Sequence, residues 1–304
     1  MAEIRSSGTW GSALTADEFT AIKSTGFEPV GQVLGAAVYN IGYTGGYACP
    51  AAAAGYYSGG LSLGGYGGPM RTTTAVSSGG GWGSYAPLVQ TMYQARRAAI
   101  GRMSAECAEL GGHGVVGVSL TIGHFPAGGL EFKAIGTAIR APGAMQLSQP
   151  FTSDLSGQDF AKLILAGWVP AGLALGISIG ARHDDWLTIS QTRWGSGNIE
   201  VQGYTDLVND TRHDARTQLQ RDVSRLGAEG VVVQRMEMRV GEHECTMQEG
   251  RRDHVVEATI IGTAIAHFGG RHLEEAPPPP LAVMSLDPQR RQAARVRLGP
   301  AGPE

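Results

Sequence analysis

The sequence predicts an α+β protein built from two tandem βαββ units, each a small, mainly antiparallel sheet covered by one long helix. Three observations predict it: a long helical pattern that ends at glycine, two strand patterns that follow it, and the occurrence of this order twice. The first copy begins with ARRAAIGRM at Ala95 and the second with TRHDARTQL at Thr211. Both copies close on the same letters, GTAI, which start at Gly136 and Gly262. Such self-similarity is the signature of a duplicated unit, so function is a question about one unit and about the pair.

The repeat divides the chain into five parts. We expect an N-terminal arm at 1–13, a first repeat at 14–140, a linker at 141–155, a second repeat at 156–268 and a tail at 269–304. The 304 residues are enough for two domains of roughly 150 residues each.

Each repeat is expected to open with a short helix and a strand. Thr15 has capping-box spacing to Glu18, and the second copy begins in the same way at Ser156. A glycine then ends each short helix. The strands that follow, at 30–39 and 171–180, both contain the pair Leu-Gly. Glycine inside a strand usually marks a bulge or a close approach of another backbone.

A long amphipathic helix follows in each repeat. In the first, at 88–110, apolar residues recur every three or four positions: Leu88, Met92, Ala95, Ala99, Met103, Cys107 and Leu110. The second helix has the same stripe up to Leu226, and its other faces carry many Asp and Arg residues. These charges are typical of a solvated face with local ion pairs.

Two strands rich in β-branched residues complete each repeat, at 115–122 and 130–140 and again at 231–240 and 255–266. One small sheet with a helix on one face leaves the other face partly uncovered, and the tandem copy or copies from other chains could bury it, so we expect assembly. The candidate packing and oligomer residues are those that both copies share: Gly35, Gly136, Thr137, Gly176, Gly262 and Thr263. A glycine at the same place in both copies suggests close packing against a neighbouring backbone.

Composition excludes several classes of function. The net charge of -3 gives no reason to expect a nucleic-acid partner. Three cysteines without CxxC spacing indicate no disulfide framework, which fits the cytoplasm. The segment 163–181 is uncharged and long enough to suggest a membrane span. Its repeat partner carries Lys23 and Glu28, however, and Pro170 favours a turn and a buried strand, so no membrane span is predicted.

Two segments lie outside the repeat. The insert at 41–87 is rich in glycine and tyrosine, and both a flexible surface insertion and an interaction or pore-lining loop fit it. The tail contains a stiff polyproline spacer and is expected to be disordered. Four arginines in it form a candidate partner-binding peptide: Arg290, Arg291, Arg295 and Arg297.

Several of these motifs together resemble the YbjQ family, small bacterial proteins described as heavy-metal-binding domains. The segment LGAAVYN, the helix that ends in Leu-Gly, the strand VVGV and the closing GTAI carry the resemblance. It covers about 16–140 and 158–268. The resemblance implies a βαββ unit and homo-oligomeric rings, with pentamers as the associated form, and it implies no established activity. Since this chain is a tandem, we expect a pentamer or a multiple of it.

Heavy-metal binding requires soft or borderline ligands that converge. The best local cluster is His243 and Cys245, which alternate along an extended chain and can face one side. His254 on the return strand is the candidate third ligand. The first repeat has no equivalent cluster, although a site that belongs to the shared fold should occur in both copies.

An enzyme needs a nucleophile, a base and a group that orients the base. His183-Asp184-Asp185 and His213-Asp214 are suggestive, but no nucleophile motif accompanies them. The leading hypothesis is therefore a non-enzymatic, cytoplasmic protein that assembles with itself into a ring or shell-like scaffold and needs no cofactor. The alternative is a protein that binds or responds to a soft metal ion.

Overall fold

The computed structural model describes residues 11–40, 74–79, 85–125, 129–143, 147–245 and 249–267. The start of the N-terminal arm, most of the 41–87 insert and the whole tail, with its four arginines, lie outside these residues. All described residues belong to one compact unit, Met1–Phe268. Helices and antiparallel sheets are both present, which confirms the α+β prediction.

The first half of this unit is a sheet with strand order β1-β4-β3-β5 and one long helix, α4. Its elements are α2 (Ala16–Ser24), β1 (Glu28–Tyr39), α4 (Ala86–Glu109), β3 (Gly114–Phe125) and β4 (Gly129–Arg140). Strands β1, β4 and β3 pair antiparallel. The short strand β5 (Phe151–Thr152) comes from the start of the second half and pairs parallel with β3.

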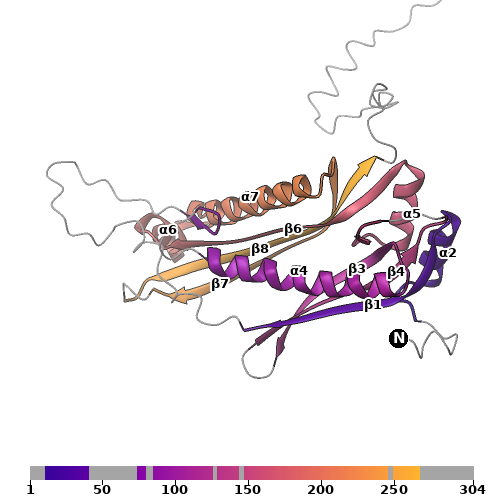
Figure 1. Ribbon diagram of the computed structural model, residues 1–304. Helices are drawn as coiled ribbons and strands as arrows, with labels where there is room; N and C mark the ends of the chain where they lie inside the picture. The colour runs from indigo at the N-terminus through magenta and orange to yellow at the C-terminus, as the bar shows by residue number, and fades with distance from the viewer. Residues whose placement is uncertain are drawn as a thin grey trace, which may run out of the picture. The chain divides into compact units, whose positions relative to one another are not determined.

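The second half has a sheet with order β2-β6-β8-β7 and the long helix α7 (Figure 1). Its elements are α5 (Gly157–Leu165), β6 (Trp168–His183), α6 (Trp186–Thr192), a short 3-10 helix (Trp194–Ser196), α7 (Gln202–Arg225), β7 (Gly230–Glu244) and β8 (Arg252–His267). The short strand β2 (Ala75–Val76), from the insert, pairs with β6. In each sheet the last strand of the βαββ unit lies between the other two, so both halves share one topology.

Local chemistry explains the shared start of each half. Thr15 and Glu18 form the predicted capping box, and the Ser156 hydroxyl accepts a hydrogen bond from the Asp159 amide. Gly26 and Gly167 end the two short helices with φ of 84° and 81°, a conformation that favours glycine. The first strand of each half then has a bulge one residue after its proline.

Helix α4 packs between the two sheets. Ala95, Ala99 and Met103 form a core with its own sheet, and Leu175 and Ile261 of the second sheet join that core. Helix α7 packs on the opposite face of the second sheet, against Ala174, Ala258 and Ile260. Strand β6 is therefore covered on both faces, whereas no described residue covers Leu34 and Val38 on the outer face of the first sheet.

Among the described residues, no helix combines the length and the apolar character that a membrane span requires. The uncharged segment at 163–181 forms the end of α5 and most of the buried strand β6.

Candidate functional site

The shared threonines of the closing strands anchor the segment that opens each half. The Thr263 hydroxyl lies 3.0 Å from the Ser153 hydroxyl and accepts a hydrogen bond of 3.1 Å from the Asp154 amide. The Thr137 hydroxyl lies 3.3 Å from the Ser12 hydroxyl and accepts a bond of 3.2 Å from the Ala13 amide. The same contacts occur in both halves, so these threonines position the opening segments.

The shared glycines are crowded by neighbouring backbone, as their repetition suggested. A Cβ added at Gly35 would lie 1.9 Å from the Ala99 carbonyl oxygen of α4, and one at Gly176 would lie 2.2 Å from the Ala215 carbonyl oxygen of α7. A Cβ at Gly136 would lie 2.5 Å from Val115 Cγ1 of β3, and one at Gly262 would lie 2.6 Å from the Val232 carbonyl oxygen of β7. All these contacts lie within one chain: the first two glycines let each helix sit close to its sheet, and the other two let the closing strand lie close to the bulged strand. A role in the oligomer stays a prediction.

The two halves meet where the opening segment of the second joins the sheet of the first; we call this the junction. The Ser153 amide donates to the Val115 carbonyl oxygen over 2.8 Å, and the Ser153 carbonyl oxygen accepts from the Val118 amide over 2.9 Å. Leu155 and Phe160 fill an apolar pocket, which we call the first socket, formed by Ile22, Val116 and Ile139. All three socket residues are fully buried, so a β-bridge and an apolar cluster hold the junction together.

Strand β2 pairs with only two residues at the outer edge of β6, and side chains cap the rest of that edge. The amides of Leu173, Leu175, Ile177 and Ile179 donate, in turn, to the Thr152 hydroxyl, the Asp222 carboxylate, the Tyr93 hydroxyl and the Ser77 hydroxyl. In the first half the Leu34 amide donates to Glu106, which occupies the aligned position of Asp222. Capping of this kind keeps another strand from pairing with the edge, because an uncapped row of amides could form hydrogen bonds with it.

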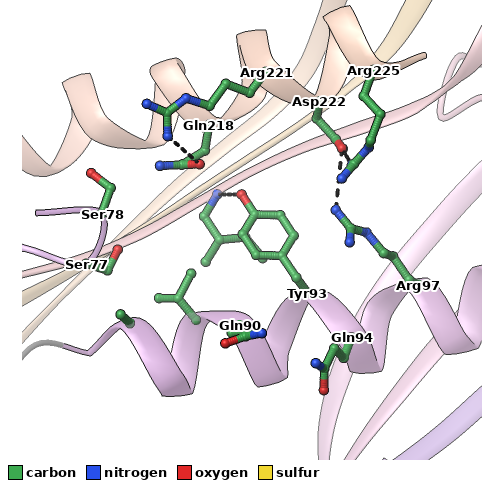
Figure 2. A pocket seen from close by; sticks show the side chains of 13 residues that line it. Ser77, Ser78, Gln90, Tyr93, Gln94, Arg97, Gln218, Arg221, Asp222 and Arg225 are labelled. Carbon is green, nitrogen blue, oxygen red and sulfur yellow. Dashed lines mark hydrogen bonds and ion pairs between the residues drawn. The ribbon is translucent and has the colours of Figure 1, made fainter. Parts of the chain in front are cut away.

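A cavity of about 470 Å³ lies over this edge, between α4 and α7. Figure 2 shows Tyr93 reaching from α4 to β6, with Arg97 and Arg225 converging on Asp222. Burial raises the pKa of the Tyr93 phenol, so it stays protonated and acts as both donor and acceptor on the strand. Three polar side chains that line this cavity, those of Ser77, Tyr93 and Asp222, thus cap the β6 edge.

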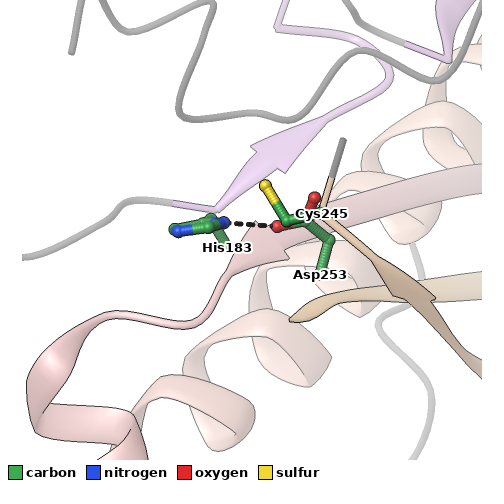
Figure 3. A group of neighbouring side chains, drawn as sticks. All are labelled: His183, Cys245 and Asp253. Atoms are coloured by element: carbon green, nitrogen blue, oxygen red, sulfur yellow. Dashed lines mark hydrogen bonds and ion pairs between the residues drawn. The ribbon is translucent and has the colours of Figure 1, made fainter. Parts of the chain in front are cut away.

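The structure brings together a different set of candidate metal ligands from the set that the sequence predicts. One buried group has its candidate ligand atoms within 4.8 Å of one another: His183, Cys245 and Asp253 (Figure 3). His183 Nδ1 lies 2.6 Å from Asp253 Oδ1. Of the predicted set only Cys245 belongs to this group. His243 is exposed, and His254 Nδ1 lies 3.1 Å from Asp184 Oδ1.

The reason lies in how the hairpin of β7 and β8 is aligned. His243 pairs with Asp253 across the two strands, and β6 brings His183 to the other side of Asp253. Local spacing on one hairpin cannot reveal a ligand from a third strand. His183 did stand out in the sequence, as part of a pair with Asp184.

The other cysteine in the described residues belongs to the core. Cys107 is fully buried in the stripe of α4. Burial raises the pKa of its thiol to about 12, which fits a small core residue and not a ligand or nucleophile.

Comparison with known proteins supplies the family. The chain is 31% identical over 266 residues to the Encapsulin nanocompartment protein Rv1762c of Mycobacterium tuberculosis, which covers 85% of this chain and 86% of that protein. The chain belongs to the family of that protein. Residues 72–142 also match the YbjQ family model, described as "Putative heavy-metal-binding". No solved structure gives a significant match.

The family model covers the long helix and the last two strands of the first half, so the resemblance to the YbjQ family is confirmed there. The second half lies outside that match and is related to the first by its topology and by the repeated contacts of Thr137 and Thr263.

Proposed function

We propose that this protein is a structural component that assembles with itself into a shell-like nanocompartment or ring, built from tandem YbjQ-like units. The observation that carries the proposal is the similarity to an encapsulin nanocompartment protein along most of both chains. Self-assembly, and not catalysis or ligand turnover, is then the function, and the cytoplasm is the proposed location.

The surface of the described residues supports this proposal. Leu34 and Val38 on the outer face of β1 are 48% and 47% exposed, and Met236 and Val240 on β7 are 50% and 66% exposed. Apolar side chains on edge strands favour association with another chain.

The assembly is proposed to be a pentamer or a multiple of it, and the arginines of the tail are proposed to bind a protein partner.

The assembly is tested by the mass of the purified protein. Light scattering and native mass spectrometry at micromolar concentration are expected to give a particle that is a multiple of the 31.8 kDa chain. A multiple of five would support the ring expected from YbjQ-like units. A monodisperse monomer across this concentration range would contradict the proposed function.

A second candidate function is binding of a soft or borderline metal ion at His183, Cys245 and Asp253. The three side chains fit such an ion, because one nitrogen, one sulfur and one oxygen ligand are a set that zinc accepts. Ligand atoms around tetrahedral zinc lie about 3.5 Å apart. The group would therefore contract from its present limit of 4.8 Å, and the 2.6 Å hydrogen bond between His183 Nδ1 and Asp253 Oδ1 would open to admit the ion. The imidazole, thiolate and carboxylate would hold the ion at the end of β6, away from the junction.

Zinc titration by calorimetry on the full chain distinguishes the two possible ligand sets. The wild type is expected to bind one equivalent through this group, and Cys245→Ala and His183→Ala are expected to lose it. His243→Ala serves as the matched control, since His243 belongs only to the set predicted from local spacing. Retained binding in His183→Ala together with loss in His243→Ala would favour the hairpin set instead. Absence of binding in the wild type would end this candidate.

A further inference from the structure

The junction inside the chain is a head-to-tail contact, because the two halves use different surfaces in it. Helix α4 of the first half covers Ile177 and Ile179 on β6. No helix in the described part of the chain covers the aligned residues on β1, Ala36 and Val38 in this way, and Val38 is 47% exposed. A head-to-tail contact can repeat with a further copy, forming a closed ring or an open filament.

The first half receives the opening segment of the second half on a surface that we call the acceptor surface. The second half carries the same surface. Leu163, Val232 and Ile265 align with the three residues of the first socket, and we call them the second socket. Each is half-buried in the single chain, whereas its counterpart in the first half is fully buried. Beside this socket, β7 is the edge strand of its sheet among the described residues. Leu163 and Val232 pack along the border of the cluster that contains Leu155 and Phe160, but they stay only half-buried, so the socket keeps an exposed side next to the β7 edge. This exposed side and the strand edge together form the surface that can receive a further opening segment.

The first half carries a matching opening segment, which we call the donor segment. Residues 11–19 align without gaps with 152–160, so Ser12, Leu14 and Phe19 correspond to Ser153, Leu155 and Phe160. The hydroxyl of Ser12 lies against Thr137 as that of Ser153 lies against Thr263, which presents both segments in the same way. Leu14 and Phe19 remain half-buried in the single chain.

We propose that the opening segment of one copy adds as a short parallel strand to β7 of a second copy and seats Leu14 and Phe19 in its second socket. The inference rests on the proposed self-assembly and names its contact. The strand pairing follows the internal register, in which Thr152 pairs with Val115, so Gly11 of one copy pairs with Val231 of the other. The Ser12 amide then donates to the Val231 carbonyl oxygen.

The same contact covers the open outer face of the first sheet. Within the chain, Leu175 and Ile179 are 2% and 4% exposed because α4 and its neighbours lie over them. Leu34 and Val38 occupy the aligned positions on β1. Repeating the junction brings α7 of the second copy over these two residues, so one contact covers both the second socket and this face of β1.

Two sequence differences distinguish the contact between copies from the internal junction. Gly117, with φ of 63°, donates to the Leu155 carbonyl oxygen, but the aligned residue of β7 is Val233, which disfavours that conformation. Gly157 touches Glu18 so closely that a Cβ would lie 2.7 Å from it, and the aligned residue is Ala16. The contact between copies therefore has a wider helix spacing and fewer backbone bonds. This fits an interface that forms between chains that are already folded.

The test uses two variants that each block one side of the contact. Leu14→Asp removes the donor and Val232→Asp removes the acceptor, so each alone is expected to reduce the particle to single chains in light scattering. An equimolar mixture is expected to form dimers and nothing larger, because one intact donor then meets one intact acceptor. Gly241→Asp is the matched control: it places the same charge on β7 outside the socket, at an exposed position where a Cβ meets no atom closer than 4.0 Å, and should leave the particle size unchanged.

A cysteine pair tests the same register without disturbing the apolar contact. Gly11→Cys with Val231→Cys should give disulfide-linked ladders in multiples of 31.8 kDa under oxidising conditions, and neither single variant should. If the wild type is large but both aspartate variants keep its size and the cysteine pair gives no ladder, this contact is wrong while self-assembly stands. If the wild type is monomeric, the proposed function fails first.

Discussion

Gly35→Ala is expected to lower the free energy of unfolding by about 3 kcal/mol or more, the upper end of what overpacking costs. The new methyl group would lie 1.9 Å from the Ala99 carbonyl oxygen and 2.5 Å from the Met103 amide nitrogen. Both are backbone atoms of α4, so no side-chain rotation relieves the clash. The helix has to lift from β1, which opens the core that Ala99 and Met103 share with Phe132. Denaturant unfolding monitored by circular dichroism measures the loss.

Gly101→Ala provides the control on the same helix. A Cβ at Gly101 meets nothing within 4 Å, and the position is exposed. Alanine is favoured over glycine in a helix by up to about 1 kcal/mol, so this variant should be slightly more stable than the wild type. Equal stability of Gly35→Ala and the wild type would show that α4 does not lie as close to β1 as the structure places it.

The duplicated sequence predicted the order of elements in each half because every element repeats its own signal. Capping spacing, a glycine stop, a proline before the strand and a Leu-Gly pair recur at matched positions, so each copy supports the assignment of the other. The glycines at 35 and 176 could be assigned to close packing for the same reason, although the sequence did not say that the neighbour is the long helix of the same unit.

The exchange of short strands between the halves could not be predicted from local pattern. Strands β2 and β5 have two residues each and are defined only by the sheets that they join. The anchors Ser12 and Ser153 were missed as well, although they align without a gap and could have been found by extending the repeat towards the N-terminus. The His183 group was missed because its members come from β6, β8 and the end of β7, which only the folded sheet brings together.

Asp222→Ala is the second substitution for which we expect a large effect, about 2–3 kcal/mol of unfolding free energy. The Asp222 carboxylate accepts a hydrogen bond of 2.9 Å from the Leu175 amide, on a residue that is 2% exposed. Removing the acceptor leaves a buried amide without a partner, which costs about 1–3 kcal/mol, and Arg97 and Arg225 also lose their ion pair. Thermal and denaturant unfolding at one fixed protein concentration measure the effect.

The repeat itself supplies the control for this prediction. Glu106→Ala removes the aligned carboxylate, which accepts a hydrogen bond of 2.7 Å from the Leu34 amide. Because Leu34 is 48% exposed, water can replace the lost acceptor in a single chain, and the expected change is within about 0.5 kcal/mol. Asp222→Asn keeps an acceptor oxygen and should recover most of the loss. Equal effects of Asp222→Ala and Glu106→Ala would mean either that the β6 edge is open to water or that the β1 edge is closed.

The proposed contact between copies closes the β1 edge in the assembled particle, since it places α7 of a second copy over Leu34. Repeating the Glu106→Ala measurement above and below the concentration at which the particle forms therefore reports on that cover directly: the cost should rise towards that of Asp222→Ala only in the assembled state.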